Sequence, residues 1–198
     1  PFWYGANKSI TFIPVSNISG STDCSLKLGA GLWIGYTSFT LKSPTLSIGF
    51  PNTLKTIGNY AFEHCHNLES LEIPNSVIEI GFGAFSDCSA LTSIVIPHSV
   101  RIIENITFYK CKSLTSIVIP SSITNIVNWA FDGCNNIKTV TCLATEPPKF
   151  TLFLEIFRIE SVFPYPNDIT LLVPKGSLYN YINSDWNNYF NGRIKEME

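Results

Sequence analysis

The chain has 198 residues, a formal net charge of −2 and only 14% charged residues, against roughly 25% in an average globular protein. It contains no cluster of Lys and Arg, which argues against binding to nucleic acid or, through a polybasic segment, to an anionic membrane. No apolar stretch approaches the roughly 18 residues of a membrane span, whereas 45% hydrophobic residues are enough for a substantial core.

The N-terminal segment, residues 1–27, follows no regular pattern. Its Ile13-Pro14 pair resembles the end of a repeat unit of the kind found further on, but the matching Ile34-Gly35 pair comes too late in the chain. Residues 15–30 are rich in Ser and Gly, which predicts an inserted loop. The glycines at 29–35 lack the Gly-x-Gly-x-x-Gly spacing of a phosphate-binding loop, and we interpret them as a connection between repeats.

Residues 28–142 carry a repeat of 23 residues. Three features recur with this step, a phenylalanine, a cysteine and an Ile-Pro pair: Phe62, Phe85, Phe108 and Phe131; Cys65, Cys88, Cys111 and Cys134; Ile73-Pro74, Ile96-Pro97 and Ile119-Pro120. A weaker unit at 28–50 has Phe39 and Ile48 in the same register. A short period shared by several residue types predicts a solenoid of about five stacked units with one continuous core.

Each unit ends in the pattern Leu-x-x-Leu-x-Ile, whose short alternating stretch predicts a strand. In the unit that begins at Pro51, Leu71 and Ile73 then face inward, while Ser70 and Glu72 face outward. Proline follows directly and ends the strand, because it has no N–H group to donate to a neighbouring strand.

After the strand, the chain is expected to turn and cross back through Val77 and Ile80, with a tight turn at Gly81. Ala84-Phe85 begins a short helical or irregular return. Its phenylalanine ring is expected to fill the interior, so that stacked units form an aromatic spine.

The third and fourth units depart from this pattern. Glu104 and Val127 stand at the glycine position, and Thr107 stands at the alanine position. The turn must differ locally, so we expect irregular backbone around 104–107.

Four of the six cysteines occupy one position of the repeat. Neighbouring strands of a parallel stack lie roughly 4.8 Å apart and point equivalent side chains the same way, which suits a ladder of buried thiols better than disulfide closure. Two alternatives remain open: disulfides such as Cys65–Cys88, and a metal site that recruits His64 and His66. The two histidines fall in a turn that is polar in the other units, so we expect them to be solvated polar residues.

The C-terminal segment, residues 143–198, predicts a degenerate repeat followed by a cap. Val162-Phe163 is interpreted as a relic of the Ala-Phe pair, and residues 171–174 as a degenerate last strand. Ser177 is expected to cap the N-terminus of a short helix that runs through Tyr181. The open end of the core is then covered, as the ends of solenoids must be, by three aromatic residues: Trp186, Tyr189 and Phe190.

The unit pattern Pro-x-x-Val-x-x-Ile-Gly-x-x-Ala-Phe-x-x-Cys-x-x-Leu-x-x-Ile-x-Ile resembles the BspA-like class of leucine-rich repeats, also called the Treponema pallidum type. The C-terminal stretches at 144–148 and 172–177 are similar to the closing module of such proteins from gut and oral Bacteroidetes. The resemblance implies an α/β-type repeat solenoid, a right-handed leucine-rich-repeat superhelix with a parallel sheet of short strands. We expect one domain over residues 1–198, with regular repeats at 28–142 between two terminal caps.

Members of this class are typically exported or attached to the cell surface, and some are adhesins for host matrix proteins, so the resemblance implies a secreted or outer-surface location. The chain begins at Pro1 without a signal-peptide pattern, as a mature or trimmed chain would. The class has no shared catalytic motif, and none of the three histidines sits in a Ser/His/Asp or Cys/His motif. We expect no enzyme activity, no cofactor, no metal site and a monomeric chain.

The outward strand positions are the candidate ligand surface. Two stripes cross the units: Ser47, Ser70, Ser93, Ser116 and Thr139, and beside them Gly49, Glu72, Val95, Val118 and Thr141. Valines exposed among small hydroxyls suit a protein or glycan ligand, for example in host extracellular matrix, although β-branched residues also favour strands for their own sake. The alternatives are a structural spacer within a larger surface protein and an unrecognised enzyme.

Overall fold

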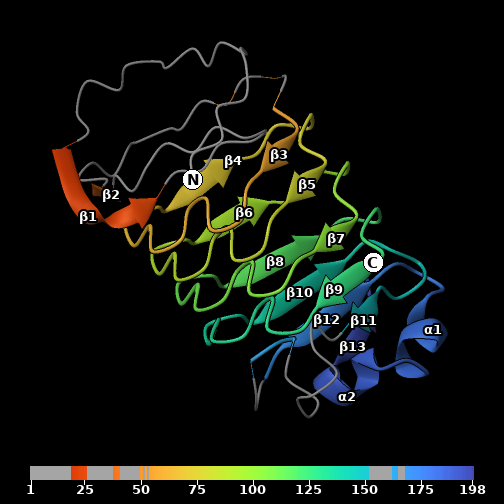
Figure 1. Ribbon diagram of the computed structural model, residues 1–198. Coiled ribbons are helices and arrows are strands. Elements are labelled where there is room, and N and C mark those ends of the chain that lie inside the picture. Colours follow the sequence, from red (N-terminus) through yellow and green to blue (C-terminus); the bar gives the residue numbers. More distant parts are fainter. Residues whose placement is uncertain are drawn as a thin grey trace.

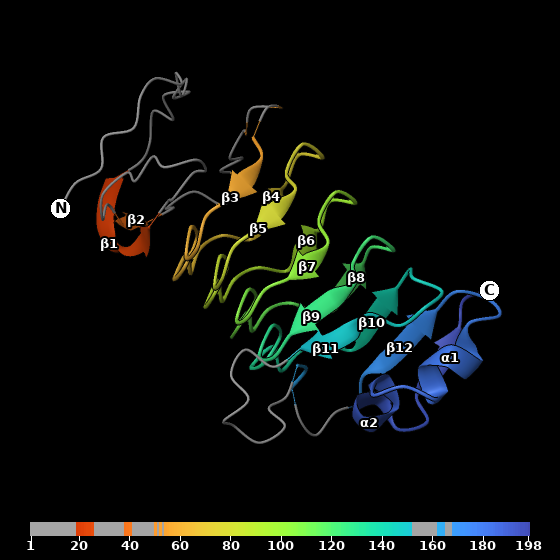
Figure 2. The ribbon, with the colours of Figure 1, turned by 45° about the vertical axis from the view of Figure 1, so that its right-hand side comes forward.

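The structure, a computed structural model, describes residues 50, 52, 54–151, 162–164 and 168–198, together with the backbone of 19–25 and 38–40. The described chain winds into a solenoid whose turns lie side by side along one axis (Figure 1). Each regular turn adds a short strand to each of two rows, and the view of Figure 2 follows the stack to the helices at its C-terminal end. The expected repeat solenoid of parallel strands is confirmed.

The first row of strands carries the candidate ligand surface. It consists of β4 (Ser70–Glu72), β6 (Ser93–Val95), β8 (Ser116–Ile119), β10 (Thr139–Cys142), β12 (Thr170–Val173) and β13 (Ile194–Glu196). Strands of the regular repeats pair parallel with an offset of one 23-residue unit, so that Leu71 lies opposite Ile94 and Ile117 opposite Val140. The alternation is as predicted, because Leu71 is buried between exposed Ser70 and Glu72.

A second row of strands was not predicted from the sequence. It consists of β3 (Thr56–Ile57), β5 (Glu79–Ile80), β7 (Ile102–Ile103), β9 (Asn125–Val127) and β11 (Lys149–Thr151), again paired in parallel. The expected crossing through Val77 and Ile80 is therefore a strand in part, since Ile80 belongs to β5. Strands of two or three residues are too short to show an alternating pattern in the sequence.

The chain returns from the second row to the first through hydrogen-bonded turns. The amide of Phe62 donates to the carbonyl of Ala84 over 2.7 Å, and the amide of Phe108 donates to that of Ala130 over 2.8 Å. Within the described ranges, α-helix occurs only in the C-terminal cap, as α1 (Leu178–Ile182) and α2 (Trp186–Phe190). The irregular form of the return is thus the correct alternative, and the solenoid is a β-solenoid with little helix.

The glycine at position 81 serves a different purpose from the one predicted. The left-handed backbone of each turn lies two residues later, with φ of 57° at Tyr60, 60° at Gly83, 49° at Ile106 and 61° at Trp129. A Cβ atom on Gly81 would lie 2.5 Å from Oδ1 of Asn59. Glycine is required at this position by close packing rather than by a tight turn.

The expected irregular backbone around 104–107 is wrong at its central residue. Ile106 has the same left-handed φ as its counterparts, although β-branched residues rarely adopt it. What differs is a buried side chain, because Nδ2 of Asn105 donates to the backbone oxygen of Asn128 over 2.6 Å. The substitutions change the hydrogen bonds between turns and leave this backbone conformation in place.

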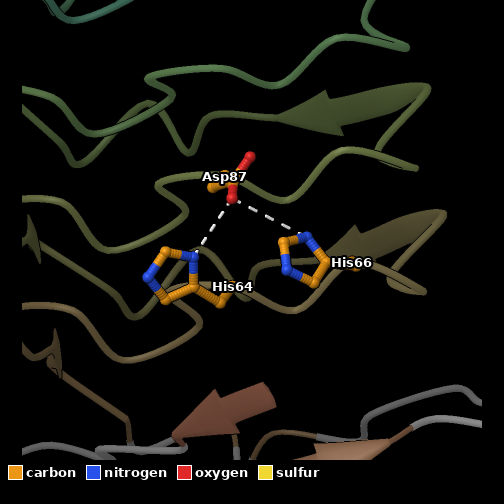
Figure 3. A group of neighbouring side chains, drawn as sticks. All are labelled: His64, His66 and Asp87. Carbon is orange, nitrogen blue, oxygen red and sulfur yellow. Dashed lines mark hydrogen bonds and ion pairs between the residues drawn. The ribbon is translucent and has the colours of Figure 1, made fainter.

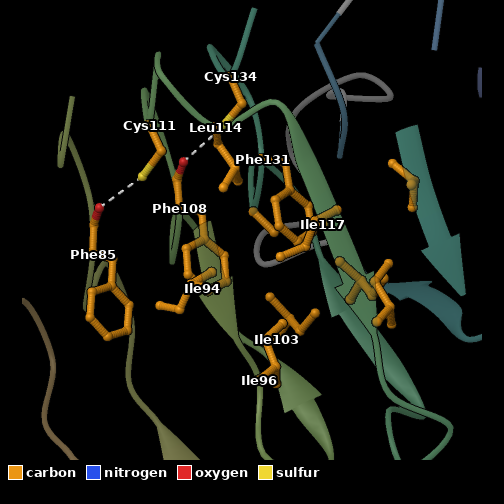
Figure 4. Packing of buried hydrophobic residues seen from close by; sticks show 14 of the residues in the cluster. Phe85, Ile94, Ile96, Ile103, Phe108, Cys111, Leu114, Ile117, Phe131 and Cys134 are labelled. Atoms are coloured by element: carbon orange, nitrogen blue, oxygen red, sulfur yellow. Dashed lines mark hydrogen bonds between the residues drawn. The ribbon is translucent and has the colours of Figure 1, made fainter. Parts of the chain in front are cut away.

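The aromatic spine is confirmed and is longer than the regular repeats. Neighbouring rings stack with centroids 5.2–5.6 Å apart and interplanar angles of 9° or less (Figure 4), in the order Phe62, Phe85, Phe108, Phe131 and Phe163. Phe163 continues the stack although it follows Phe131 by 32 residues instead of 23. The amide of Phe131 donates to the carbonyl of Val162, so Val162-Phe163 takes the place of an Ala-Phe pair as predicted.

The cysteine ladder lies beside the spine. Cys88, Cys111 and Cys134 are buried free cysteines. Cys65 is buried and disulfide-bonded, so the ladder of free thiols begins at Cys88, and the alternative of a Cys65–Cys88 disulfide is wrong. The thiol of Cys134 donates to the carbonyl oxygen of Phe108 over 2.9 Å, and the other two free thiols repeat this contact one and two units earlier.

The C-terminal cap closes the core as predicted. Trp186 and Phe190 are buried against Phe163, and Nε1 of Trp186 donates to the oxygen of Pro148 over 2.8 Å. The hydroxyl of Tyr181 donates to the oxygen of Ala144 over 2.8 Å. The degenerate strand is β12, but it is not the last, because β13 pairs beside it.

The predicted cap by Ser177 is wrong in its chemistry. Ser177 does occupy the N-cap position of α1, but its side chain makes no capping bond and donates to the oxygen of Pro174 instead. The first turn is capped by Glu196 of β13, whose Oε1 accepts from the amides of Gly176 over 2.8 Å and Leu178 over 3.3 Å. A carboxylate is favourable there because the free amides of a helix N-terminus carry partial positive charge.

The N-terminal segment contains β1 (Ser19–Ser25), which pairs antiparallel with β2 (Ser38–Thr40). The loop predicted over 15–30 is therefore wrong for the residues of β1. The outward positions Ser47 and Gly49, and the other members of the weak unit at 28–50 except β2 and Phe50, lie outside the described residues. No helix in the described part of the chain has the length and hydropathy to cross a membrane.

Candidate ligand surface

The outward side chains of the first row form a continuous surface, which we name the strand face: Ser70, Glu72, Ser93, Val95, Ser116, Val118, Thr139 and Thr141. The backbone register places Ser70 opposite Ser93 and Glu72 opposite Val95 in one strand pair. It places residues 116 and 118 opposite 139 and 141 in the next pair. The structure thus brings the eight predicted residues together in the two predicted stripes.

The strand face is more exposed at its N-terminal side. The six residues of β4, β6 and β8 are exposed, while Thr139 and Thr141 are partly buried. Val95 has 71% and Val118 has 48% of its surface exposed, although both are apolar. A ligand that buries these two valines gains their apolar contact area, at roughly 25 cal/mol per Å².

The two stripes continue into the C-terminal segment, where the sequence did not lead us to extend them. Thr170 pairs with Thr139, and Leu172 pairs with Thr141. Lys195 of β13 lies opposite Leu172 and is exposed. The sequence did contain the signal for β12, the degenerate strand at 171–174, but β13 lacks the 23-residue spacing that would reveal it.

Exposed apolar residues also occur on the second row. Ile78, next to β5, and Ile102, in β7, are both exposed. Sequence reasoning missed them because it did not predict these strands. Since apolar exposure is shared by both rows, the hydroxyl stripe beside Val95 and Val118 distinguishes the strand face, and Ile78 and Ile102 provide a matched surface for comparison.

The free cysteines are poorly suited to act as nucleophiles. Burial raises the pKa of Cys88 and of Cys134 well above the ordinary thiol value, and burial also raises the pKa of Cys142. Nucleophilic attack requires the thiolate and an approach path for the substrate. These thiols are neutral near pH 7 and enclosed in the core.

The two histidines of the first described turn, His64 and His66, are exposed as expected. The stacking of turns brings both of them next to Asp87 of the following unit. Among the residues that the structure describes, these three form the only group of His, Cys, Asp and Glu whose ligand atoms are close enough to hold a metal ion together. They do not belong to the strand face.

The repeats match a known family. Residues 33–146 match the BspA type Leucine rich repeat region, in six copies, close to the five units that we expected. This confirms the resemblance, and the match covers more than half of the chain. A comparison with curated proteins found no match.

Solved structures with the same fold are bacterial. A leucine rich cell surface protein from Faecalibacterium prausnitzii A2-165 is 31% identical, with a TM-score of 0.57, over 70% of this chain and 34% of that one. The pneumococcal vaccine antigen PcpA shares the fold at 19% identity, with a TM-score of 0.51, over 74% of this chain and 38% of that one. The chain thus spans little more than a third of the length of either protein.

Proposed function

Because the chain belongs to the BspA-type leucine-rich repeat family, we propose that it is a non-catalytic binding module of a secreted or cell-surface protein, with the strand face as its ligand surface. The ligand is a protein or a glycan of the host surface, such as an extracellular-matrix component. The observation that carries the proposal is the exposure of Val95 and Val118 side by side with small hydroxyls.

The strand face suits a broad, flat ligand. Its backbone is held by parallel pairing between units and by the stacked spine behind it, so little conformational entropy is lost on binding. Serine and threonine hydroxyls both donate and accept hydrogen bonds, which fits the polar groups of a glycan or a protein loop. The printed description of the Faecalibacterium protein as a cell surface protein supports the proposed location.

The test measures binding of the chain to immobilised matrix proteins and mucus glycoproteins. The double variant V95K/V118K places two charges on the strand face, and we expect it to lose capture. The matched control I78K/I102K places two charges on the second row, and we expect it to bind like the wild type. Thermal unfolding of all three chains verifies that any loss of binding does not come from loss of fold.

A second pair of variants separates the methyl contacts from shape. V95T/V118T keeps β-branched side chains of the same size, and we expect weakened but measurable binding. If V95K/V118K captures every ligand that the wild type captures, the strand face is not the ligand surface.

A structural spacer is the second candidate function. It is favoured by the spine, which runs without interruption from Phe62 to Phe163 and makes the units one stiff body. It is also consistent with the short share of the similar proteins that this chain spans. Wild-type chain that captures none of the host components favours the spacer.

A further inference from the structure

Three metal-ligating side chains gather at one edge of the solenoid, on the turns that lead into the first row. His64 and His66 come from the turn before β4, and Asp87 comes from the equivalent turn before β6 (Figure 3). Oδ2 of Asp87 lies 3.1 Å from Nδ1 of His64 and 3.8 Å from Nδ1 of His66. One ligand atom from each residue lies within 4.8 Å of the other two.

The backbone beneath this cluster is fixed. His64 and Asp87 both have left-handed backbone, with φ of 60° and 57°, and the amide of His64 donates to the oxygen of Ser86 in the next turn over 2.9 Å. The amide of His66 donates to the oxygen of His64 over 2.7 Å. These bonds hold the Cα positions of the three residues in place without help from their side chains.

The combination of two imidazoles and a carboxylate does not recur in the neighbouring units. The position of His64 and Asp87 is taken by Lys110 in the third unit and by Gly133 in the fourth. A lysine is protonated near neutral pH, and glycine has no side chain. The cluster therefore depends on residues particular to the first two described units.

We propose that His64, His66 and Asp87 bind a divalent transition-metal ion of the Zn²⁺ class. Imidazole nitrogen and carboxylate oxygen are the ligands of many Zn²⁺ sites, in which three protein ligands leave a fourth position for water. Ligand atoms around a tetrahedral Zn²⁺ ion lie roughly 3.3 Å apart, for Zn–N distances of about 2.05 Å. The cluster must contract slightly, and its exposed side chains have room to move.

The neighbouring groups fit this arrangement. Side chains of His64 and His66 are 55% and 42% exposed, so an ion can reach them from solvent. With the metal at Nδ1 of His64, the Nε2 atom on the far side of the ring carries a proton and faces Oε1 of Glu63 at 3.8 Å. Carboxylates in this position orient metal-binding histidines and strengthen their nitrogen as a ligand.

The site would join two successive turns of the solenoid. His64 and His66 lie on one turn and Asp87 on the next, so the ion closes a bridge across the stack. A metal that binds the folded chain more tightly than the unfolded chain raises the temperature of unfolding. The site is separate from the strand face, and the proposal does not depend on a ligand there.

The test is a titration of the chain with ZnCl₂ followed by calorimetry, in the presence of a non-thiol reductant. We expect one Zn²⁺ per chain, and affinity at least about tenfold weaker in H64Q, H66Q and D87N, since each removes one of only three protein ligands. H98Q is the matched control, because His98 is the third exposed histidine and lies outside the cluster. We expect it to bind like the wild type.

Two further measurements test whether the fold is kept and whether thiols bind the ion. The variant H64G removes the ligand while keeping a residue that favours left-handed backbone, as Gly133 does with φ of 77°, so it separates lost binding from lost fold. Co²⁺ in place of Zn²⁺ reports the ligands by absorption, and we expect no thiolate charge-transfer band.

The proposal is overturned by equal affinity in wild type and H64Q/H66Q, by a loss in H98Q as large as in H66Q, by a thiolate band, or by no binding at millimolar Zn²⁺.

Discussion

The regular repeats and the C-terminal cap bury their aromatic rings in two different ways. In the repeats, Phe85 and Phe108 stack with an interplanar angle of 4°, and each further unit adds another parallel ring. In the cap, Tyr181 meets Trp186 at 80°, and Phe163 meets Phe190 at 65°. An interior unit has a copy of itself on either side, so one ring geometry serves every unit, whereas the last unit must be covered by different residues.

Hydrogen bonds show the same contrast. In the repeats, a cysteine thiol donates to a phenylalanine carbonyl, and this contact recurs with the period of the chain. In the cap, Tyr181 and Trp186 each donate to a single carbonyl, of Ala144 and Pro148, with no equivalent among the regular units. Stability in the repeats is therefore spread over many similar contacts, while stability of the cap depends on a few particular ones.

Removal of a central ring tests the repeat side of this comparison and has the largest expected effect. Phe108 is fully buried between Phe85 and Phe131, so F108A leaves a cavity and should lower the free energy of unfolding by about 3–5 kcal/mol. Urea denaturation measures the change. The control is Y179A, since Tyr179 is exposed in the cap. A loss below about 1 kcal/mol would contradict the spine as a core element.

Replacement of the capping tryptophan tests the other side. W186F keeps an aromatic ring but leaves the buried oxygen of Pro148 without its indole donor, which should cost about 2 kcal/mol. We expect amide exchange to increase in β11, β12 and α2 while the units around β5 and β7 remain protected, because solenoid units depend chiefly on their neighbours. An equal increase along the whole chain would show that cap and repeats unfold as one unit.

Alkaline pH should affect the repeats before the cap. Burial raises the pKa values of Cys88, Cys134 and Tyr181 in the folded chain, so the unfolded chain loses these protons first and stability falls as pH rises. The fall begins near the unfolded thiol value of about 8.5, well before that of tyrosine at about 10. Each thiol contributes a loss of about 1 kcal/mol between pH 8.5 and 9.5.

Urea denaturation at a series of pH values measures this dependence. The variant C88A/C134A should flatten the profile below pH 10, and Y181F should leave that part of the profile unchanged. A profile that is flat up to pH 10 in the wild type would argue against neutral, buried thiols.

The smallest expected effect lies at the helix cap. E196Q keeps an acceptor for the amides of Gly176 and Leu178 but removes the negative charge at the start of α1. We expect a loss of about 0.5 kcal/mol in the free energy of unfolding, seen by thermal unfolding at low ionic strength and reduced by added salt. E198Q is the control, because Glu198 is exposed and makes no such contact among the described hydrogen bonds. An equal loss in E198Q would indicate a general charge effect.

Residues in the regular units could be placed from the sequence because the period identifies equivalent positions. Once Phe62 and Phe85 are aligned, stacking follows, and the alternation around Leu71 decides which side chains are buried. The strand face was predicted residue by residue for the same reason. Its two stripes were not followed into β12 and β13, where an insertion after Phe131 and the helices of the cap interrupt the 23-residue step.

Other features had no comparable sequence signal. The second row has strands of two or three residues, so Ile102 gives no alternating pattern that would mark it as exposed. The left-handed position was assigned to Gly81, whereas Tyr60, Ile106 and Trp129 adopt it because hydrogen bonds to the next turn hold the backbone there. Local preference was overruled by contacts between units.

By itself, the sequence determined the family, the stacking of parallel units, the buried spine and thiols, and the aromatic nature of the cap. These follow from periodicity, because equivalent positions in a repeat meet equivalent surroundings. Only the tertiary structure decided that Glu196 caps α1, that Phe163 continues the spine across a longer spacing, and that His64 and His66 meet Asp87. Such contacts join residues far apart in the chain, and their geometry depends on how each turn is seated on the next.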